Sequence, residues 1–167
     1  MKTMIYIGVD PGKEGAVAWI KTGDQATCGV IDIPVIKPPG SKVATYDLVK
    51  CRDLIVKLAC PILGKPQTPV MAAVEEQSVR PRQSAKSAKT IGHGEMLWLA
   101  LFCAMGIGVD RPTPQSWKRA MGVKGDKHTS MAAAHSLYPY MRSQIIRHDH
   151  AEALLIAEYL KRTTGEI

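Results

Sequence analysis

Three short apolar segments open the chain, and turn signals separate them. They are "MIYIGVD" (residues 4–10), "GAVAWIK" (15–21) and "ATCGVIDI" (26–33), with glycine-containing turns at 12–15 and 23–24 between them. Short runs rich in β-branched residues and bounded by Gly, Pro or Asp are typical of β-strands joined by tight turns. The pattern therefore predicts that the protein begins with three antiparallel strands.

The rest of the chain alternates between helical and extended patterns of apolar residues. For example, Leu48, Cys51, Ile55 and Leu58 recur at the spacing of one helix face. In chain order the pattern predicts a Pro/Gly loop at 34–45, a helix from Tyr46 to Pro61, a strand at 69–76 ("PVMAAVEE"), a helix at 84–105, a strand at 106–112 ("GIGVDRP"), two short basic helices at 115–121 and 127–137, and a final helix from about His148.

This order of elements is that of the RNase H-like fold, in which helices cover both faces of a mixed sheet. We therefore expect an α/β protein with a mixed five-stranded central sheet flanked by helices. No repeat or change of composition divides residues 1–167, and 46% of them are hydrophobic, which is enough to bury one core. We expect a single domain.

The apolar and cysteine patterns argue against a membrane or disulfide-rich protein. The longest apolar run, "MLWLALFCAMGIGV" (96–109), is too short for a bilayer span and contains glycines. The first residues, "MKTMIYIGVD", lack a signal-peptide pattern. The four cysteines form no C-x-x-C pair, so no zinc site or disulfide framework is indicated. We expect a soluble, cytoplasmic protein without a membrane partner.

Positive charge gathers in the middle of the chain. The formal net charge is +7, and residues 77–148 alone carry eleven basic residues against three acids. Such a surface attracts polyanions, and nucleic acids bind it with release of counterions. A solvated basic face is the simpler interpretation, but we expect DNA contacts from Arg80, Arg82, Lys86, Lys89, Lys118, Arg119, Lys124 and Lys127.

Acidic residues follow two predicted strands and open the last helix. Asp10 ends the first strand, Glu75 and Glu76 end the fourth, and Asp149 and Glu152 begin the final helix three residues apart. Positions i and i+3 share one helix face, and a helix packed across the sheet can bring that face to the strand ends. The sequence therefore predicts a cluster of four carboxylates.

Such a cluster needs a cation, because neighbouring carboxylates repel one another. Acids in a first helical turn also complement the helix dipole, which is a purely structural use, but it does not explain the acids at the strand ends. Mg²⁺ and Mn²⁺ prefer oxygen ligands of this kind. Two such ions roughly 4 Å apart can activate water and stabilise the leaving oxygen in phosphodiester cleavage. We expect two Mg²⁺ or Mn²⁺ ions and no organic cofactor.

Four segments carry a family resemblance: "GVDPGKEGAVAWI" (8–20), "AAVEEQSVRP" (72–81), "PTPQSWKRAMGVKGDKHTSM" (112–131) and "HDHAEALLIA" (148–157). Together they resemble the motif blocks of RuvC-type Holliday junction resolvases, most closely the small forms from bacteriophages and other mobile elements. The first segment alone is weakly specific, because sugar kinases share a strand that ends in Asp-x-Gly. The order of all four is more specific, and the resemblance spans nearly the whole chain.

The resemblance implies metal-binding, catalytic roles for particular acids. Asp10 matches the family's first-strand aspartate. Asp149 and Glu152 match the paired acids of the last helix, with glutamate where bacterial members usually have aspartate. At the second segment two registers remain open, since the strand position favours Glu75 whereas the pair "EQ" favours Glu76. We choose Glu75 as the ligand and keep Glu76 as the alternative.

The third segment adds cations and an aromatic residue. Lys118 and Lys127 fall where the family carries lysines near the scissile phosphate, and a cation there stabilises charge in the transition state. Trp117 could stack on a base, but we favour packing into the core. His148 and His150 flank the last pair of acids, and either could serve as a hydrogen-bond partner of a metal ligand.

The resemblance implies a dimeric endonuclease that resolves Holliday junctions in a bacterial host cell and leaves 5′-phosphate ends. Two symmetric cuts need two active sites related by a two-fold axis, and the apolar run 96–105, with Leu97 and Leu101, offers a surface for a homodimer. Two alternatives stay open: an RNase H-like nuclease acting on RNA–DNA hybrids or other branched DNA, and a nucleic-acid-binding protein without a working metal site.

Overall fold

The computed structural model describes residues 3–24, 26–59, 68–78, 84–124 and 126–165, and its helices and strands there follow the predicted order. Its elements are β1 (Ile5–Asp10), β2 (Ala16–Lys21), β3 (Thr27–Asp32), β4 (Val35–Ile36), β5 (Thr45–Tyr46), α1 (Leu48–Ala59), β6 (Val70–Val74), α2 (Ala85–Ala104), β7 (Gly108–Asp110), α3 (Pro114–Ala120), α4 (Lys127–Leu137), the 3-10 helix η1 (Pro139–Met141) and α5 (His148–Thr164).

The central sheet is mixed, as predicted. Across the described part of the chain, its five strands lie in the order β3-β2-β1-β6-β7. The β1–β2 and β2–β3 pairs are antiparallel, whereas β6 runs parallel to both β1 and β7. Because parallel neighbours end at the same edge of a sheet, the carboxyl ends of β1 and β6 lie side by side, with Val9 opposite Val74.

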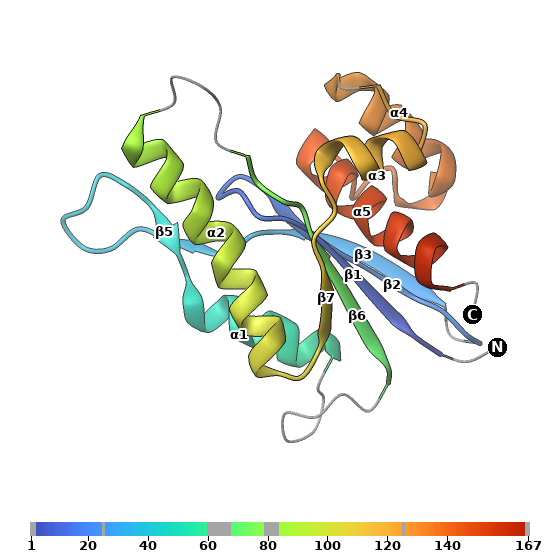
Figure 1. The fold of residues 1–167 in the computed structure, drawn as a ribbon, viewed down its shortest axis with the longest axis horizontal. Helices are drawn as coiled ribbons and strands as arrows, with labels where there is room; N and C mark the ends of the chain where they lie inside the picture. The colour runs from blue at the N-terminus through green and yellow to red at the C-terminus, as the bar shows by residue number, and fades with distance from the viewer. Residues whose placement is uncertain (1–2, 25, 60–67, 79–83, 125, 166–167) are drawn as a thin grey trace.

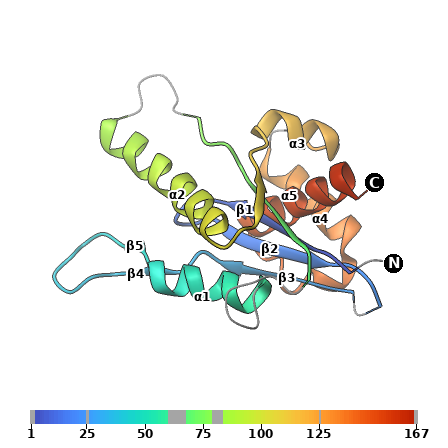
Figure 2. The same ribbon diagram turned by 60° about the horizontal axis from the view of Figure 1, so that its bottom comes forward.

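Helices cover both faces of this sheet (Figures 1 and 2). On one face, α3, α4 and α5 bury a core that includes Trp117, Leu154 and Leu155. On the other face, α1 and α2 bury a second core that includes Trp98 and Phe102. The sheet separates the two cores, so alternate residues of each strand belong to opposite sides.

The position of α5 on the sheet is fixed by a contact between backbones. A Cβ added to Gly8 of β1 would lie 2.2 Å from the carbonyl oxygen of Ala153 and 2.4 Å from the nitrogen of Ala157. Neither backbone atom can move without moving the helix, so only glycine fits at this position. The helix therefore rests directly on β1, two residues before Asp10.

The predicted loop at 34–45 contains a small second sheet. Strands β4 and β5 pair antiparallel, with Val35 opposite Tyr46 and Ile36 opposite Thr45. Figures 1 and 2 show this pair extending beyond the end of the main sheet. Each strand has two residues, which is too short to produce an alternating pattern, so the prediction of a Pro/Gly loop missed this pair. Tyr46, predicted to begin the next helix, belongs to β5, and α1 begins at Leu48.

Helix α2 is the most apolar helix of the second face. Trp98 and Phe102 are fully buried, Leu97 and Leu101 are half-buried against the same core, and Met96 is 60% exposed. In the part of the chain that the structure describes, neither α2 nor another helix combines the length and apolarity that a bilayer crossing requires. Packing of these side chains into the second core explains most of the apolar run at 96–105.

Candidate active site

The strand ends direct Asp10 and Glu75 to the same side of the sheet. Val9 and Val74 both belong to the core under α1 and α2, so the residue after each of them turns toward α5. The backbone nitrogen of Glu75 also donates to the Val9 carbonyl at 3.0 Å, which holds the two strand ends together. The same alternation turns Glu76 away, where it interacts electrostatically with Arg111.

Helix α5 supplies the other two acids. Asp149 and Glu152 lie on the face of the helix that meets the strand ends, and their side chains are 16% and 15% exposed. The residues between and after them, including His150, Ala151 and Ala153, are buried in the protein. The helix thus buries one side completely, and its two acids lie partly exposed at the edge of the sheet.

The four carboxylates interact with one another. Burial, followed by the negative charges of Glu75 and Asp149, raises the pKa of Asp10 to about 7, against a weaker opposing hydrogen bond from the Gly12 nitrogen. Burial also raises the pKa of Glu75, and Glu152 adds to this increase. The structure therefore brings together Asp10, Glu75, Asp149 and Glu152, as the sequence predicted, and Glu75 rather than Glu76 faces the other acids.

Two neutral donors hold Glu75. The Trp117 indole Nε1 donates to Oε1 at 2.9 Å, and the Gln77 side-chain amide donates to Oε2 at 2.9 Å. Trp117 is fully buried, so it packs in the core as expected and has no free face for a base. Sequence reasoning missed Gln77, although a residue two positions after Glu75 in an extended segment points to the same side.

Cationic groups flank the helix acids instead. Lys118 Nζ lies 2.8 Å from Glu152 Oε1, which also accepts from the Ser130 hydroxyl at 3.1 Å. His148 Nε2 lies 3.0 Å from Asp149 Oδ1. Arg147 Nη1 also lies 4.0 Å from Asp149 Oδ2, so each of the two helix acids has a cationic side chain beside it that offsets part of its charge.

His150 turns away from the acids between which it stands in the sequence. Its Nε2 lies 2.6 Å from Asp32 Oδ1 at the end of β3, and its Nδ1 lies 3.0 Å from the Gln144 carbonyl oxygen. The ring is 6% exposed and joins β3 to the start of α5. Of the two histidines proposed as partners of a metal ligand, the structure therefore brings only His148 to one of the four acids of the cluster.

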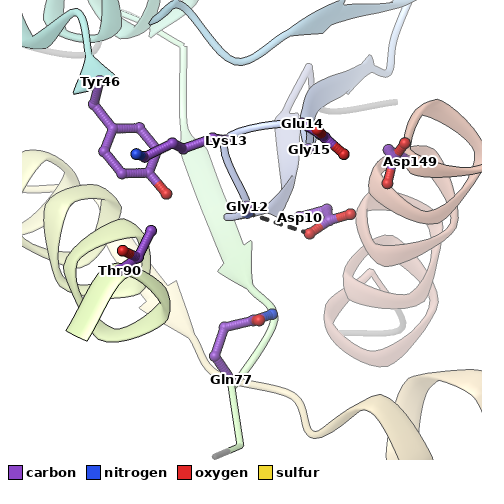
Figure 3. A pocket seen from close by; sticks show the side chains of 9 residues that line it. All are labelled: Asp10, Gly12, Lys13, Glu14, Gly15, Tyr46, Gln77, Thr90 and Asp149. Carbon is purple, nitrogen blue, oxygen red and sulfur yellow. Dashed lines mark hydrogen bonds between the residues drawn. The ribbon is translucent and has the colours of Figure 1, made fainter. Parts of the chain in front are cut away.

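A pocket of about 470 Å³ opens beside Asp10 (Figure 3). In the view of Figure 3, Asp10 and Asp149 face each other across its mouth, and Gln77 approaches from the end of β6. Tyr46 closes the far side, where its hydroxyl donates to the Pro11 carbonyl at 3.0 Å. The remaining lining comes from Gly12, Lys13, Glu14, Gly15 and Thr90.

The acid cluster has the chemistry of a divalent-cation site, but its side chains are not arranged as a coordination shell. Within the described ranges, no group of three or more His, Cys, Asp or Glu side chains is close enough together to hold a metal ion. Glu75 turns its oxygens to Trp117 and Gln77, and Glu152 pairs with Lys118. Nevertheless, the four carboxylates form a donor set that a hard cation would stabilise, and the raised pKa of Asp10 shows that its charged form is disfavoured without one.

The basic residues predicted to contact DNA fall into two groups. Lys118 lies at the acid cluster, whereas Lys89, Arg119 and Lys124 are exposed. Lys127 begins α4 and Lys86 lies in α2, but their side chains are outside the described part of the structure, as are Arg80 and Arg82 altogether.

The mixed sheet, its flanking helices and the position of the acids define an RNase H-like fold. Two solved structures are similar to the chain over nearly its whole length. One is T. thermophilus RuvC in complex with a Holliday junction substrate, with a TM-score of 0.63 and 18% sequence identity over 96% of both chains. The other is the Thermus thermophilus RuvC structure, with a TM-score of 0.56 and 14% identity over 97% of both chains.

No protein-family model matches the chain, and no curated protein sequence does either. At 18% identity or less, the similarity to RuvC shows the fold. The chain therefore has a RuvC-like fold, and its chemistry has to be argued from its own residues.

Proposed function

We propose that the protein is a structure-selective endonuclease that resolves four-way DNA junctions by Mg²⁺- or Mn²⁺-dependent phosphodiester hydrolysis. The observation that carries this proposal is the convergence of Asp10, Glu75, Asp149 and Glu152 at one edge of a RuvC-like sheet. The family resemblance of the four sequence segments supports the choice of substrate and implies 5′-phosphate products.

The four carboxylates would hold the cations, and bound cations would supply an activated water and stabilise the leaving oxygen. Asp10 and Glu75 act from the rigid strand ends, which limits their movement. Lys118 contributes a positive charge at the edge of the cluster, where it can contact a phosphate oxygen. The exposed Lys89, Arg119 and Lys124 bind the backbone of the DNA arms away from the acids.

A cleavage assay tests this function. The protein is incubated with a synthetic four-way junction, a linear duplex of the same sequence and an RNA–DNA hybrid, each with Mg²⁺, Mn²⁺ or a chelator. We expect paired symmetric cuts in the junction with either metal, and no cutting by the Asp10→Asn variant as a matched control. Preferential cutting of the hybrid would show that RNA–DNA hybrids, and not junctions, are the substrate. Cutting of the linear duplex as fast as the junction would refute junction selectivity.

The ion pair of Lys118 with Glu152 favours a second candidate, a junction-binding protein without a working metal site. In that case the lysine would neutralise the cluster permanently. Metal-independent binding of the junction, together with an unfolding temperature that neither Mg²⁺ nor Mn²⁺ changes, would support this candidate against the nuclease.

Resolution by paired cuts also requires two sites, so we propose a homodimer with α2 in its interface. Among the α2 side chains that the structure describes, Met96 is the exposed large apolar one, whereas Leu97 and Leu101 already pack against the core. Met96→Glu is therefore the better test, because it leaves the core intact. We expect it to weaken the dimer in sedimentation experiments, and a wild-type protein that stays monomeric with junction DNA would contradict the proposal.

A further inference from the structure

Glu75 has an unusual environment for a carboxylate in a charged cluster. Its side chain is 8% exposed, and each of its two oxygens accepts one hydrogen bond of 2.9 Å from an uncharged group. By contrast, Glu152 is bound by the ammonium group of Lys118. Neutral donors fix the orientation of a carboxylate without cancelling its charge, and the remaining lone pairs stay available for a cation.

The first donor is placed by the short helix α3. Thr113 caps this helix by accepting from the Ser116 nitrogen, and Pro114 occupies its first turn. Trp117 is fully buried in the core beneath the helix. A buried indole needs a partner for its N–H, and here the partner is a carboxylate from a strand 42 residues earlier. The next residue of α3 is Lys118, so one turn of helix contacts two acids of the cluster.

The second donor is placed by α2. The backbone nitrogen of Gln77 donates to Glu95 Oε2 at 3.2 Å, and Arg111 binds the other oxygen of Glu95. Glu95 is 6% exposed, so this contact is shielded from solvent. It holds the segment after β6 in place, and the Gln77 side chain can then reach back to Glu75.

We propose that Trp117 and Gln77 are positioning residues that orient the Glu75 carboxylate within the acid cluster, and that Glu95 holds Gln77 in place for this task. The inference rests on the proposed nuclease function for its catalytic consequence. The hydrogen bonds themselves are independent of it. Removing either donor lets the carboxylate rotate, so cation binding and cleavage weaken while the DNA-binding surface stays unchanged.

Indole NMR tests the contact directly. The chain has three tryptophans, so ¹⁵N-labelled protein gives three indole N–H signals, and Trp117→Phe assigns the relevant one. We expect Glu75→Gln and the addition of Mg²⁺ each to move the Trp117 signal and to leave the Trp98 signal in place. A Trp117 signal that Glu75→Gln does not move would overturn the inference, whatever the protein does to DNA.

Cleavage measurements test the consequence. Trp117→Phe and Gln77→Leu should each lower the single-turnover rate, or raise the Mg²⁺ concentration needed for half-maximal rate, by about 10- to 100-fold without changing junction affinity. Trp98→Phe is the matched control, because Trp98 is equally buried but its Nε1 has no hydrogen-bond partner among the described residues. It should lower the unfolding temperature and leave the Mg²⁺ dependence unchanged.

The two proposals fail in different ways. If the wild-type protein cuts no junction, the nuclease function is wrong, and the NMR experiment still decides the contact. If the wild-type protein cuts junctions and both donor variants keep its rate and Mg²⁺ dependence, the positioning role is wrong and the nuclease function stands.

Discussion

The acid cluster has two halves, which differ in the groups that surround their carboxylates. In the strand half, Glu75 is buried and Asp10 borders the pocket, both accept hydrogen bonds from uncharged N–H groups, and the pKa values of both are raised. The helix half, Asp149 and Glu152, is partly open to solvent and has cationic side chains beside it. Ionising the strand acids is therefore unfavourable in the folded protein, whereas cationic side chains offset part of the charge of the helix acids.

This difference indicates how a cation would enter the site. A cation would gain most from the strand half, where the raised pKa values of Asp10 and Glu75 show that their charged forms are disfavoured without one. In the helix half it would have to displace Lys118 from Glu152, which frees that lysine for another anion, such as a phosphate. The strand half thus offers a cation a carboxylate, Glu75, whose orientation is already fixed. The helix half offers an ion pair, Lys118 with Glu152, in which a cation can take the place of the lysine.

The largest expected effect comes from removing one carboxylate charge from either half. Asp10→Asn, Glu75→Gln, Asp149→Asn and Glu152→Gln should each reduce junction cleavage by roughly 10³-fold or more, since bound metal contributes several kcal/mol to transition-state stabilisation. Junction binding, measured by gel shift in a chelator, should persist.

Glu76→Gln is the matched control for Glu75→Gln, because the two neighbouring residues face opposite sides of the sheet. We expect near-normal cleavage from Glu76→Gln. Loss of cleavage in Glu76→Gln with normal cleavage in Glu75→Gln would show that Glu76, and not Glu75, is the metal ligand.

The next effect concerns the cation of the helix half. Lys118→Ala should lower the single-turnover rate at saturating protein by about 10²-fold, because it removes a positive charge beside the reacting phosphate. We expect the same class of effect from Lys127→Ala.

Arg119→Ala serves as the control on the same helix. Since Arg119 is exposed, its loss should weaken binding and lower the salt dependence of binding by about one unit, with little change in rate. We expect Arg80→Ala and Arg82→Ala to behave similarly. Equal losses of rate and affinity in all these variants would contradict the division between catalytic and binding cations.

A separate effect should appear in the free energy of unfolding. The pKa of Asp10 rises from 3.8 to about 7 on folding, so the folded protein binds the proton more tightly and loses stability as pH rises through that window. Asp10→Asn removes this loss. It should be more stable than the wild type at pH 8 by a few kcal/mol, at about 1.4 kcal/mol per pKa unit, and no more stable at pH 4.

Thermal unfolding at both pH values, with and without Mg²⁺, measures this difference. Mg²⁺ should narrow it, because bound cation stabilises the wild type. Asp149→Asn is the comparison from the helix half and should bring no such gain, since its carboxylate lies beside His148 and Arg147. A stabilisation by Asp10→Asn that is the same at pH 4 and pH 8 would show that the ionisation of Asp10 is not its cause.

The fold and the membership of the acid cluster were accessible from sequence because both depend on regular periods. Alternation along β1 and β6 directs Asp10 and Glu75 to one face, and the helical period places Asp149 and Glu152 together. The same alternation could have decided between Glu75 and Glu76, since the apolar Val74 marks the opposite face.

The contacts that orient the acids were not accessible in this way. The hydrogen bond from Trp117 to Glu75 joins residues 42 positions apart and depends on where α3 packs. His150 resembles a site residue because of its neighbours in sequence, yet the packing of α5 turns it to Asp32. Local patterns show which face a side chain takes, whereas its partner depends on the placement of whole elements.

The contact of Gly8 with Ala153 and Ala157 has a consequence for how the protein tolerates mutation. Because backbone meets backbone there, main-chain atoms set the spacing of β1 and α5 at this point. Substitutions elsewhere in the core should therefore reduce the amount of folded protein before they reduce the activity of each folded molecule. A deep mutational scan that scores abundance and cleavage separately should find that Gly8→Ala lowers cleavage per folded molecule, because a Cβ at this position pushes α5 and its two acids away from β1.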